Sequence, residues 1–150
     1  MMKTEITAEE MVSILHDMGY RASCSVFGTD VIVNSASQGF AWQLNVCEIN
    51  ENKASDFLMF SHLRDVNPVL YPIGRICNEF NREAPQGVAT YIMIDKEDLT
   101  HEALINLELA ISLHGGVSEE WVRSQITGWD FTLGMFDQKV RECEEPSSND

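Results

Sequence analysis

The sequence has few basic residues and no long apolar run. Ten Lys and Arg stand against 24 Asp and Glu, so the formal net charge is -14. A charge of this sign repels phosphate groups, and we therefore expect neither a nucleic-acid partner nor a membrane-surface role. No window approaches the roughly 18 to 20 apolar residues of a membrane span, and the N-terminus lacks an apolar run of signal-peptide length. The sequence therefore predicts a cytoplasmic protein.

Short-spaced cysteine pairs are also missing. The four cysteines are Cys24, Cys47, Cys77 and Cys143. This spacing contains no C-x-x-C motif and does not resemble the dense framework of a small disulfide-rich domain. We interpret all four side chains as reduced thiols.

The motifs of the common enzyme classes are absent. We find no serine nucleophile elbow, no phosphate-binding Walker loop and no dinucleotide glycine motif. The four histidines are His16, His62, His101 and His114, and none lies three or four residues from another His or from a Cys, as local metal chelation favours. The sequence thus predicts a non-enzyme without metal or cofactor. The alternative is a hydrolase or metal-dependent enzyme whose site is assembled from dispersed His and Asp residues.

What the sequence does contain is one long patterned stretch, residues 103–140. It opens with apolar residues at every second position from Ile105 to Ile111, which is typical of a strand with one buried face. Gly115 and Gly116 then allow a turn, and Ser118 can cap the next helix. That helix carries one apolar seam, formed by Val122, Ile126, Trp129, Leu133, Phe136 and Val140.

The rest of the chain supplies further helices and strands. Thr7 and Glu10 can form a capping box for a helix that starts at residue 8 and ends at Gly19. A second helix is predicted from Pro72 to about Arg82. Alternating or β-prone residues predict strands at 20–27, 30–34, 40–47, 56–64 and 88–94, although a short helix fits 56–64 nearly as well.

The order of elements predicts the fold class. A helix, three or four strands, a helix, two strands and a helix follow one another, so helices are segregated from runs of strands. We expect a single α+β domain over residues 1–150, with three helices and a mostly antiparallel sheet of five or six strands. Residues 142–150 lose the periodicity and are expected to form a disordered acidic tail.

Two short motifs carry a family resemblance. The run Asn78-Glu-Phe-Asn-Arg82, a β-prone strand, an acidic turn, another strand and Gly115-Gly-Val-Ser-Glu119 follow in this order. From about residue 9 to 140 the sequence resembles the YbjN-like family, which is described as bacterial sensory-transduction regulators with a fold similar to type III secretion chaperones. The resemblance implies a cytoplasmic protein without known enzymatic activity that binds another protein. It implies no catalytic residue.

The residues of these motifs have structural explanations of their own. Asn78 and Asn81 can bond nearby backbone around a helix terminus, and Arg82 suits the carbonyl end of the helix. We interpret the glycine pair as a turn and Ser118 as a cap.

A second line of residues on the last helix is not explained by the buried seam alone. Trp121, Gly128, Thr132 and Met135 follow at spacings of 7, 4 and 3, beside the apolar seam. Small residues there would allow another backbone to approach, and an exposed Trp favours a partner. The line is our candidate surface for a protein or peptide partner or for a homodimer, and the alternative is a wide stripe that faces the core. The predicted function is an acidic regulatory or chaperone-like protein that binds a polypeptide.

Overall fold

The structure is a computed structural model that describes residues 2–27, 30–46, 53–54, 56–66, 73–83, 87–95 and 101–144. The helices are α1 (Ala8–Asp17), α2 (Ile73–Glu83) and α3 (Glu119–Glu144). The strands of the main sheet are β3 (Ala22–Phe27), β4 (Asp30–Ser37), β5 (Phe40–Val46), β7 (Asp56–Val66), β8 (Val88–Asp95) and β9 (His101–Ser112). Four strands of two residues each are β1 (Met2–Lys3), β2 (Ile6–Thr7), β6 (Lys53–Ala54) and β10 (Val117–Ser118).

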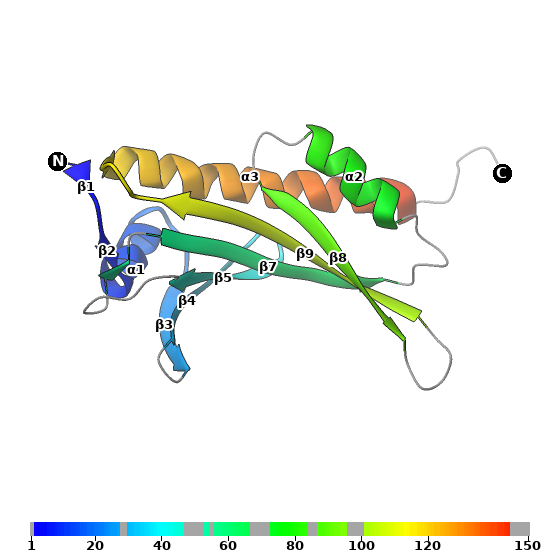
Figure 1. Cartoon of the computed structure of the whole chain (residues 1–150), viewed down its shortest axis with the longest axis horizontal. Coiled ribbons are helices and arrows are strands. Elements are labelled where there is room, and N and C mark those ends of the chain that lie inside the picture. The colour runs from blue at the N-terminus through cyan, green and yellow to red at the C-terminus, as the bar shows by residue number, and fades with distance from the viewer. Residues whose placement is uncertain are drawn as a thin grey trace.

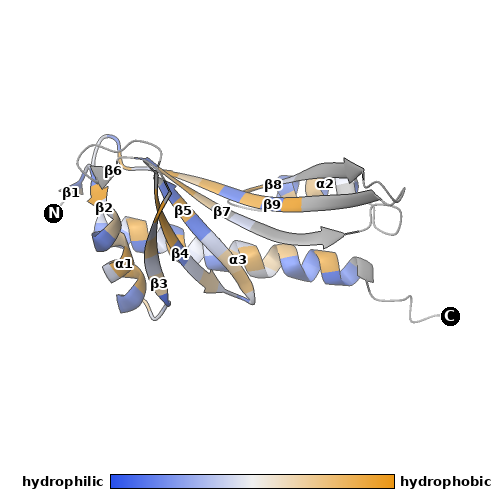
Figure 2. Cartoon of the chain, turned by 90° about the horizontal axis from the view of Figure 1, so that it is seen from below, coloured by the Kyte–Doolittle hydropathy of each residue, from blue (hydrophilic) through white to orange (hydrophobic). Residues whose placement is uncertain are grey.

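The main sheet has the order β3-β4-β5-β7-β9-β8, and every neighbouring pair is antiparallel. The prediction of a mostly antiparallel sheet of five or six strands with three helices is therefore confirmed. Residues 56–66 form a strand and not the alternative helix. Helix α3 runs along one face of the sheet, α2 lies beside the C-terminal half of α3, and α1 lies at the β3–β4 end (Figure 1). Figure 2 shows α1 and the opening strands at one end of the molecule.

The core lies between α3 and the sheet. All six residues of the predicted seam, from Val122 to Val140, are at most 1% exposed. They pack in one cluster with sheet residues such as Leu44, Met59 and Leu107. The rings of Trp129 and Trp42 meet edge to face at 6.3 Å between centroids. The apolar period read from the sequence therefore identifies the buried side of α3 correctly.

The helix ends also follow from local residues. Thr7 Oγ1 accepts a hydrogen bond from the Glu10 amide at 3.0 Å, and the Trp121 amide donates to Ser118 Oγ at 3.1 Å. Gly19 has a φ of +92° and ends α1, as predicted. The Glu10 carboxylate pairs with Lys3 at 3.3 Å, so this side chain ties the N-terminal segment to α1.

Two details differ from the expectations. Helix α3 continues to Glu144, four residues beyond the buried Val140, so residues 142–144 are helical and not part of a tail. The two-residue pairs β1–β10 and β2–β6 were not predicted, since two residues show no period and the pairing partners are distant in sequence. The start of the second helix at Pro72 and residues 145–150 lie outside the described residues.

Candidate interaction surfaces

The described histidine side chains belong to separate local contacts. His114 Nε2 lies 3.0 Å from Asp56 Oδ2, and the His114 side chain is 65% exposed. Hydrogen bonds from His114 and then from Ser112 lower the pKa of Asp56. His16 Nε2 lies 3.0 Å from the carbonyl oxygen of Ala22. Neither contact includes a second histidine or an enclosed cavity.

The alternative of a dispersed enzyme site therefore gains no support from these contacts. The side chains of His62 and His101 lie outside the described residues. Within the described part of the chain, no group of three or more His, Cys, Asp or Glu side chains is placed to hold a metal ion. Likewise, none of the described helices is both long and apolar enough to span a bilayer.

The second line on α3 does not form one continuous surface. Trp121 is 36% exposed, but Thr132 is only 1% exposed and donates a hydrogen bond to the Gly128 carbonyl at 2.7 Å. Gly128 and Met135 are half-buried, and Met135 packs against the core. Of these four residues, Trp121 is the apolar side chain that remains available to a partner.

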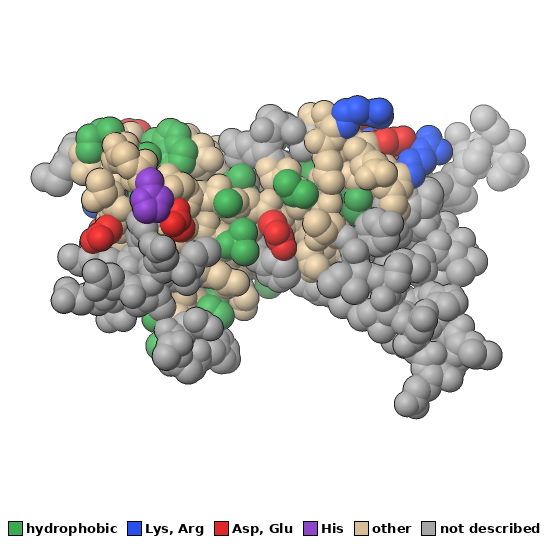
Figure 3. Space-filling model, in the orientation of Figure 1, with side chains coloured by type: hydrophobic (Ala, Val, Ile, Leu, Met, Phe, Trp, Pro, Cys, Tyr) green, Lys and Arg blue, Asp and Glu red, His purple; other side chains and the backbone are tan. Residues whose placement is uncertain are grey.

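Phe131 is a second exposed aromatic residue on α3. It is 62% exposed. No prediction from the sequence includes Phe131, because it belongs neither to the buried seam nor to the second line beside it. A large apolar residue outside the predicted core face is the signal that would have identified it. On the face in Figure 3, apolar side chains occur as separate patches between polar atoms.

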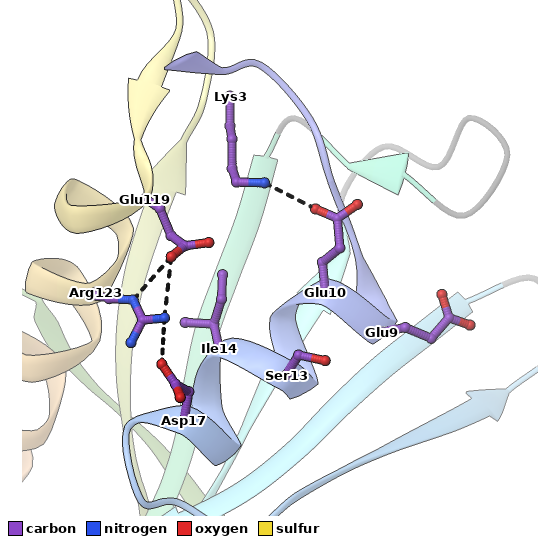
Figure 4. Close-up of a pocket in the computed structure, with 8 residues that line it drawn as sticks. All are labelled: Lys3, Glu9, Glu10, Ser13, Ile14, Asp17, Glu119 and Arg123. Carbon is purple, nitrogen blue, oxygen red and sulfur yellow. Dashed lines mark hydrogen bonds and ion pairs between the residues drawn. The ribbon is translucent and has the colours of Figure 1, made fainter. Parts of the chain in front are cut away.

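An open groove of about 460 Å³ separates α1 from the start of α3 (Figure 4). Arg123 spans it, with Asp17 of α1 at 2.8 Å and Glu119 of α3 at 3.2 Å. The hydrogen bond with Asp17 is the main cause that raises the pKa of Arg123. The groove is lined by Lys3, Glu9, Glu10, Ser13, Ile14, Asp17, Glu119 and Arg123, so carboxylates outnumber cations.

This groove could not be read from the sequence, because its two walls lie more than a hundred residues apart. Only the α1 wall of the groove can be recognised in the sequence. Glu9, Ser13 and Asp17 recur every four residues and so share one polar face of the helix. The ion pairs of Arg123 and Lys3 explain Glu10, Asp17 and Glu119 as contacts that fix α1 and the N-terminus to the rest of the fold.

The asparagine motif has a defined structural role. The Asn81 side chain donates through Nδ2 to the Ala89 carbonyl at 2.9 Å, and its Oδ1 accepts from the Ala89 amide at 2.7 Å. It therefore joins α2 to β8. Asn78 and Arg82 are exposed. The structural interpretation of Asn78 and Arg82 stays a prediction.

The glycine motif is likewise a turn. Gly115 and Gly116 both have a φ of +85°, a conformation that side chains other than glycine rarely adopt. A Cβ on Gly116 would lie 3.5 Å from the Met2 side chain, so the turn also supports strand β1. Ser118 follows as the cap of α3.

Polar side chains are hydrogen-bonded to one another on the outer face of β3, β4 and β5. Asn34 Nδ2 donates to Ser25 Oγ at 2.8 Å, and Gln43 Nε2 donates to Asn34 Oδ1 at 3.2 Å. These side chains form a chain of hydrogen bonds across β3, β4 and β5. Val33 and Leu44 point to the opposite, buried face. At these positions the outer face of β3, β4 and β5 is therefore polar.

Three helices on a six-stranded antiparallel sheet define an α+β protein of the YbjN-like fold. The solved structure described as "Crystal structure of YbjN, a putative transcription regulator from E. coli" is similar to this chain with a TM-score of 0.57. The match covers 87% of this chain and 88% of that chain at 9% sequence identity.

At this identity the likeness establishes the fold alone. The resemblance read from the sequence is confirmed at the level of structure. No family model matches the sequence. No curated protein matches it either.

Proposed function

We propose that this chain is a non-enzymatic regulatory or chaperone-like protein of the bacterial cytoplasm that binds a polypeptide partner. The observation that carries the proposal is the outer side of α3, where Trp121 is 36% and Phe131 62% exposed. Large aromatic residues are favoured at protein interfaces because they bury much apolar area at a small cost in side-chain entropy. The apolar seam of α3 is fully buried, but these two aromatic residues are exposed. Their exposure favours contact with a partner over a role in the core.

The fold supports a regulatory role, and the charge restricts how that role is exerted. YbjN, with which this chain shares its fold, is described as "a putative transcription regulator". A net charge of -14 opposes direct contact with DNA, because binding to a duplex depends on cations that replace its counterions. The regulatory interaction proposed here is therefore with a protein.

The test is a comparison of proteins retained from a bacterial lysate by three forms of the chain. These are the unchanged protein, Trp121→Asp and the matched control Thr127→Asp, which adds the same charge at another exposed position of α3. We expect at least one protein to be retained by the unchanged chain and by Thr127→Asp but lost with Trp121→Asp. An identical set from all three forms, or no retained protein, would contradict the proposal.

A further inference from the structure

The two edges of the main sheet differ in whether their outward backbone groups have hydrogen-bond partners. Strand β8 forms one edge and β3 forms the other. On β8, Asn81 of α2 pairs with both the amide and the carbonyl of Ala89, as an adjacent strand would. This contact closes the β8 edge at Ala89. An edge without such cover presents unpaired donors and acceptors to any extended chain.

Among the described strands, β3 pairs with β4 alone. Phe27 pairs with Asp30 across a two-residue connection, which makes them the hydrogen-bonded pair next to the turn. Backbone groups alternate in direction along an antiparallel strand, so Ala22, Cys24 and Val26 direct theirs away from β4.

One of these outward groups already has a partner. The Ala22 carbonyl lies 3.0 Å from His16 Nε2 of α1. For Cys24 and Val26, no other described residue forms a hydrogen bond with the outward amide or carbonyl. Both side chains are exposed, Val26 to 69%. This part of the edge is therefore accessible.

The residues of β3 include none of the usual protections of an edge strand. Its sequence, Ala-Ser-Cys-Ser-Val-Phe, contains no charged residue and no proline. Its register with β4 runs without a bulge from Ala22 to Phe27. Natural edge strands commonly carry lysine, proline or a bulge to prevent pairing with another chain. Strand β3 can therefore accept one.

The charge beside this edge indicates the kind of chain it would accept. Glu9 at the start of α1 is exposed, and its side chain points away from Lys3, Asp17 and Arg123 (Figure 4). Burial and then the Glu9 carboxylate raise the pKa of the Cys24 thiol, which agrees with a position of Glu9 beside the middle of β3. In a second copy of this chain, pairing β3 with β3 about a two-fold axis would bring two Glu9 carboxylates together, on molecules that each carry -14. A basic segment of another polypeptide would instead find an opposite charge.

We propose that the open edge of β3 binds an extended segment of a partner polypeptide as an additional strand, with a lysine or arginine of that segment facing Glu9. The backbone of Cys24 and Val26 supplies the hydrogen bonds, and Glu9 selects for basic segments. This inference rests on the proposed function in so far as the ligand is a polypeptide, but it places the contact away from the α3 surface.

The first experiment removes one backbone donor from the edge. Cys24→Pro deletes the outward amide without breaking the bonds with β4, and Cys24→Ala is the matched control that keeps the amide. The probe is a fluorescent seven-residue peptide that alternates lysine with valine and threonine, with a glutamate-for-lysine peptide beside it, and binding is followed by anisotropy. We expect the basic peptide to bind the unchanged protein and Cys24→Ala, and to bind Cys24→Pro about tenfold more weakly or worse.

The second experiment tests the charge without changing the strand. Because Glu9 is exposed, Glu9→Gln is expected to leave the fold intact. This variant should weaken binding of the basic peptide about threefold or more and reduce the salt dependence of that binding. Cys24→Ala should change neither the affinity nor its salt dependence. This variant keeps the proposal testable even if circular dichroism shows that Cys24→Pro does not fold.

Several outcomes would overturn the proposal. They are no binding of the basic peptide to the unchanged protein, equal binding by Cys24→Pro and Cys24→Ala when both fold, and equal preference for the basic and acidic peptides. A dimer that Cys24→Pro converts to monomer would also overturn it, by showing that the occupant is a second copy.

The lysate comparison separates this idea from the proposed function. If Trp121→Asp loses a partner that Cys24→Pro retains, the partner-binding role stands and the β3 proposal falls for that partner. If the peptide binds as expected while the lysate yields nothing, the β3 edge stands and the α3 surface falls.

Discussion

At the scale of single residues, Asn81 connects a sequence motif to one physical task. Its amide group pairs with both backbone groups of Ala89, at 2.9 and 2.7 Å. An asparagine side chain carries a donor and an acceptor in the same arrangement as a peptide group, so it can replace a missing strand at the sheet edge. The motif residue nearest to it on the exposed face of α2, Asn78, is available as a comparison.

We expect Asn81→Ala to lower the free energy of unfolding by about 1 to 3 kcal/mol, because it leaves the amide and the carbonyl of Ala89 without this partner. Asn78→Ala, the control, should change it by less than about 0.5 kcal/mol because Asn78 is exposed. Urea unfolding of both variants measures the difference. Equal effects would show that the Asn81 contact adds no stability.

The pair of Asp56 and His114 gives a prediction about pH. Hydrogen bonds from His114 and Ser112 hold the pKa of Asp56 below its usual value of 3.8. A carboxyl whose pKa is lower in the folded state stabilises the fold above its unfolded pKa, and this stabilisation is lost as the pH falls through the folded value. Asp56 should therefore favour the folded state above about pH 4 and cease to do so in more acidic solution.

Carbon-13 NMR titration of the Asp56 carboxyl measures this effect. We expect its pKa to rise towards 3.8 in His114→Ala, since the largest lowering cause is removed. His16→Ala is the control, because His16 contacts Ala22 and not Asp56. If the Asp56 titration is the same in all three proteins, the hydrogen bond to His114 does not form in solution.

At the scale of elements, the contact of α2 with α3 combines an aromatic pair with ion pairs. The rings of Phe80 and Phe136 meet edge to face at 4.8 Å between centroids. Lys139 of α3 lies 2.8 Å from Glu83 and 3.8 Å from Glu79 of α2. The phenyl rings are 1% exposed, whereas the Glu83 side chain is 57% exposed. Burial of the rings should therefore contribute most of the stability of this contact.

Substitutions on α3 test this ranking. Phe136→Ala should cost about 3 to 5 kcal/mol of unfolding free energy, because it leaves a cavity against Phe80. Lys139→Ala should cost less than about 1 kcal/mol, since its carboxylate partners are partly exposed to water. Phe131→Ala, the same change at a side chain that is 62% exposed, should have almost no effect. Thermal and urea unfolding would contradict the ranking if Lys139→Ala cost as much as Phe136→Ala.

At the scale of the whole molecule, net charge opposes self-association while exposed aromatic residues favour it. Two copies that each carry -14 repel, and the screening length falls from about 10 Å at 0.1 M salt to about 3 Å at 1 M. The homodimer expected from the α3 line remains a prediction. Because Thr132 is buried, Trp121 is the apolar side chain of that line that such an interface can use.

We expect added salt to strengthen self-association, because it screens the repulsion and leaves the apolar contact in place. Sedimentation velocity at tens of micromolar in low and high salt measures this. Trp121→Ser should weaken the association, and Thr127→Ser at another exposed site of α3 should not. A single monomeric species at both salt concentrations would rule out the dimer at these concentrations.

The sequence by itself determined the three helices, the strands of the main sheet other than β7, and the buried side of the longest helix. The seam from Val122 to Val140 recurs at the helical period, and the caps Thr7 and Ser118 act within a few residues of themselves. Such signals are local, since a helix or strand places neighbours in sequence at fixed positions on its faces. The order of elements then restricted the fold class to α+β with a mostly antiparallel sheet.

Only the tertiary structure decided which of these residues meet. It buried Thr132, although its position on the helix allowed exposure, and it brought Asp17 to Arg123 across the α1–α3 groove. It also closed one sheet edge at Ala89 with Asn81 and left β3 with β4 as its one neighbour among the described strands. These outcomes depend on contacts between segments far apart in the chain. Periodicity shows which face of an element is apolar, but not which neighbour covers it.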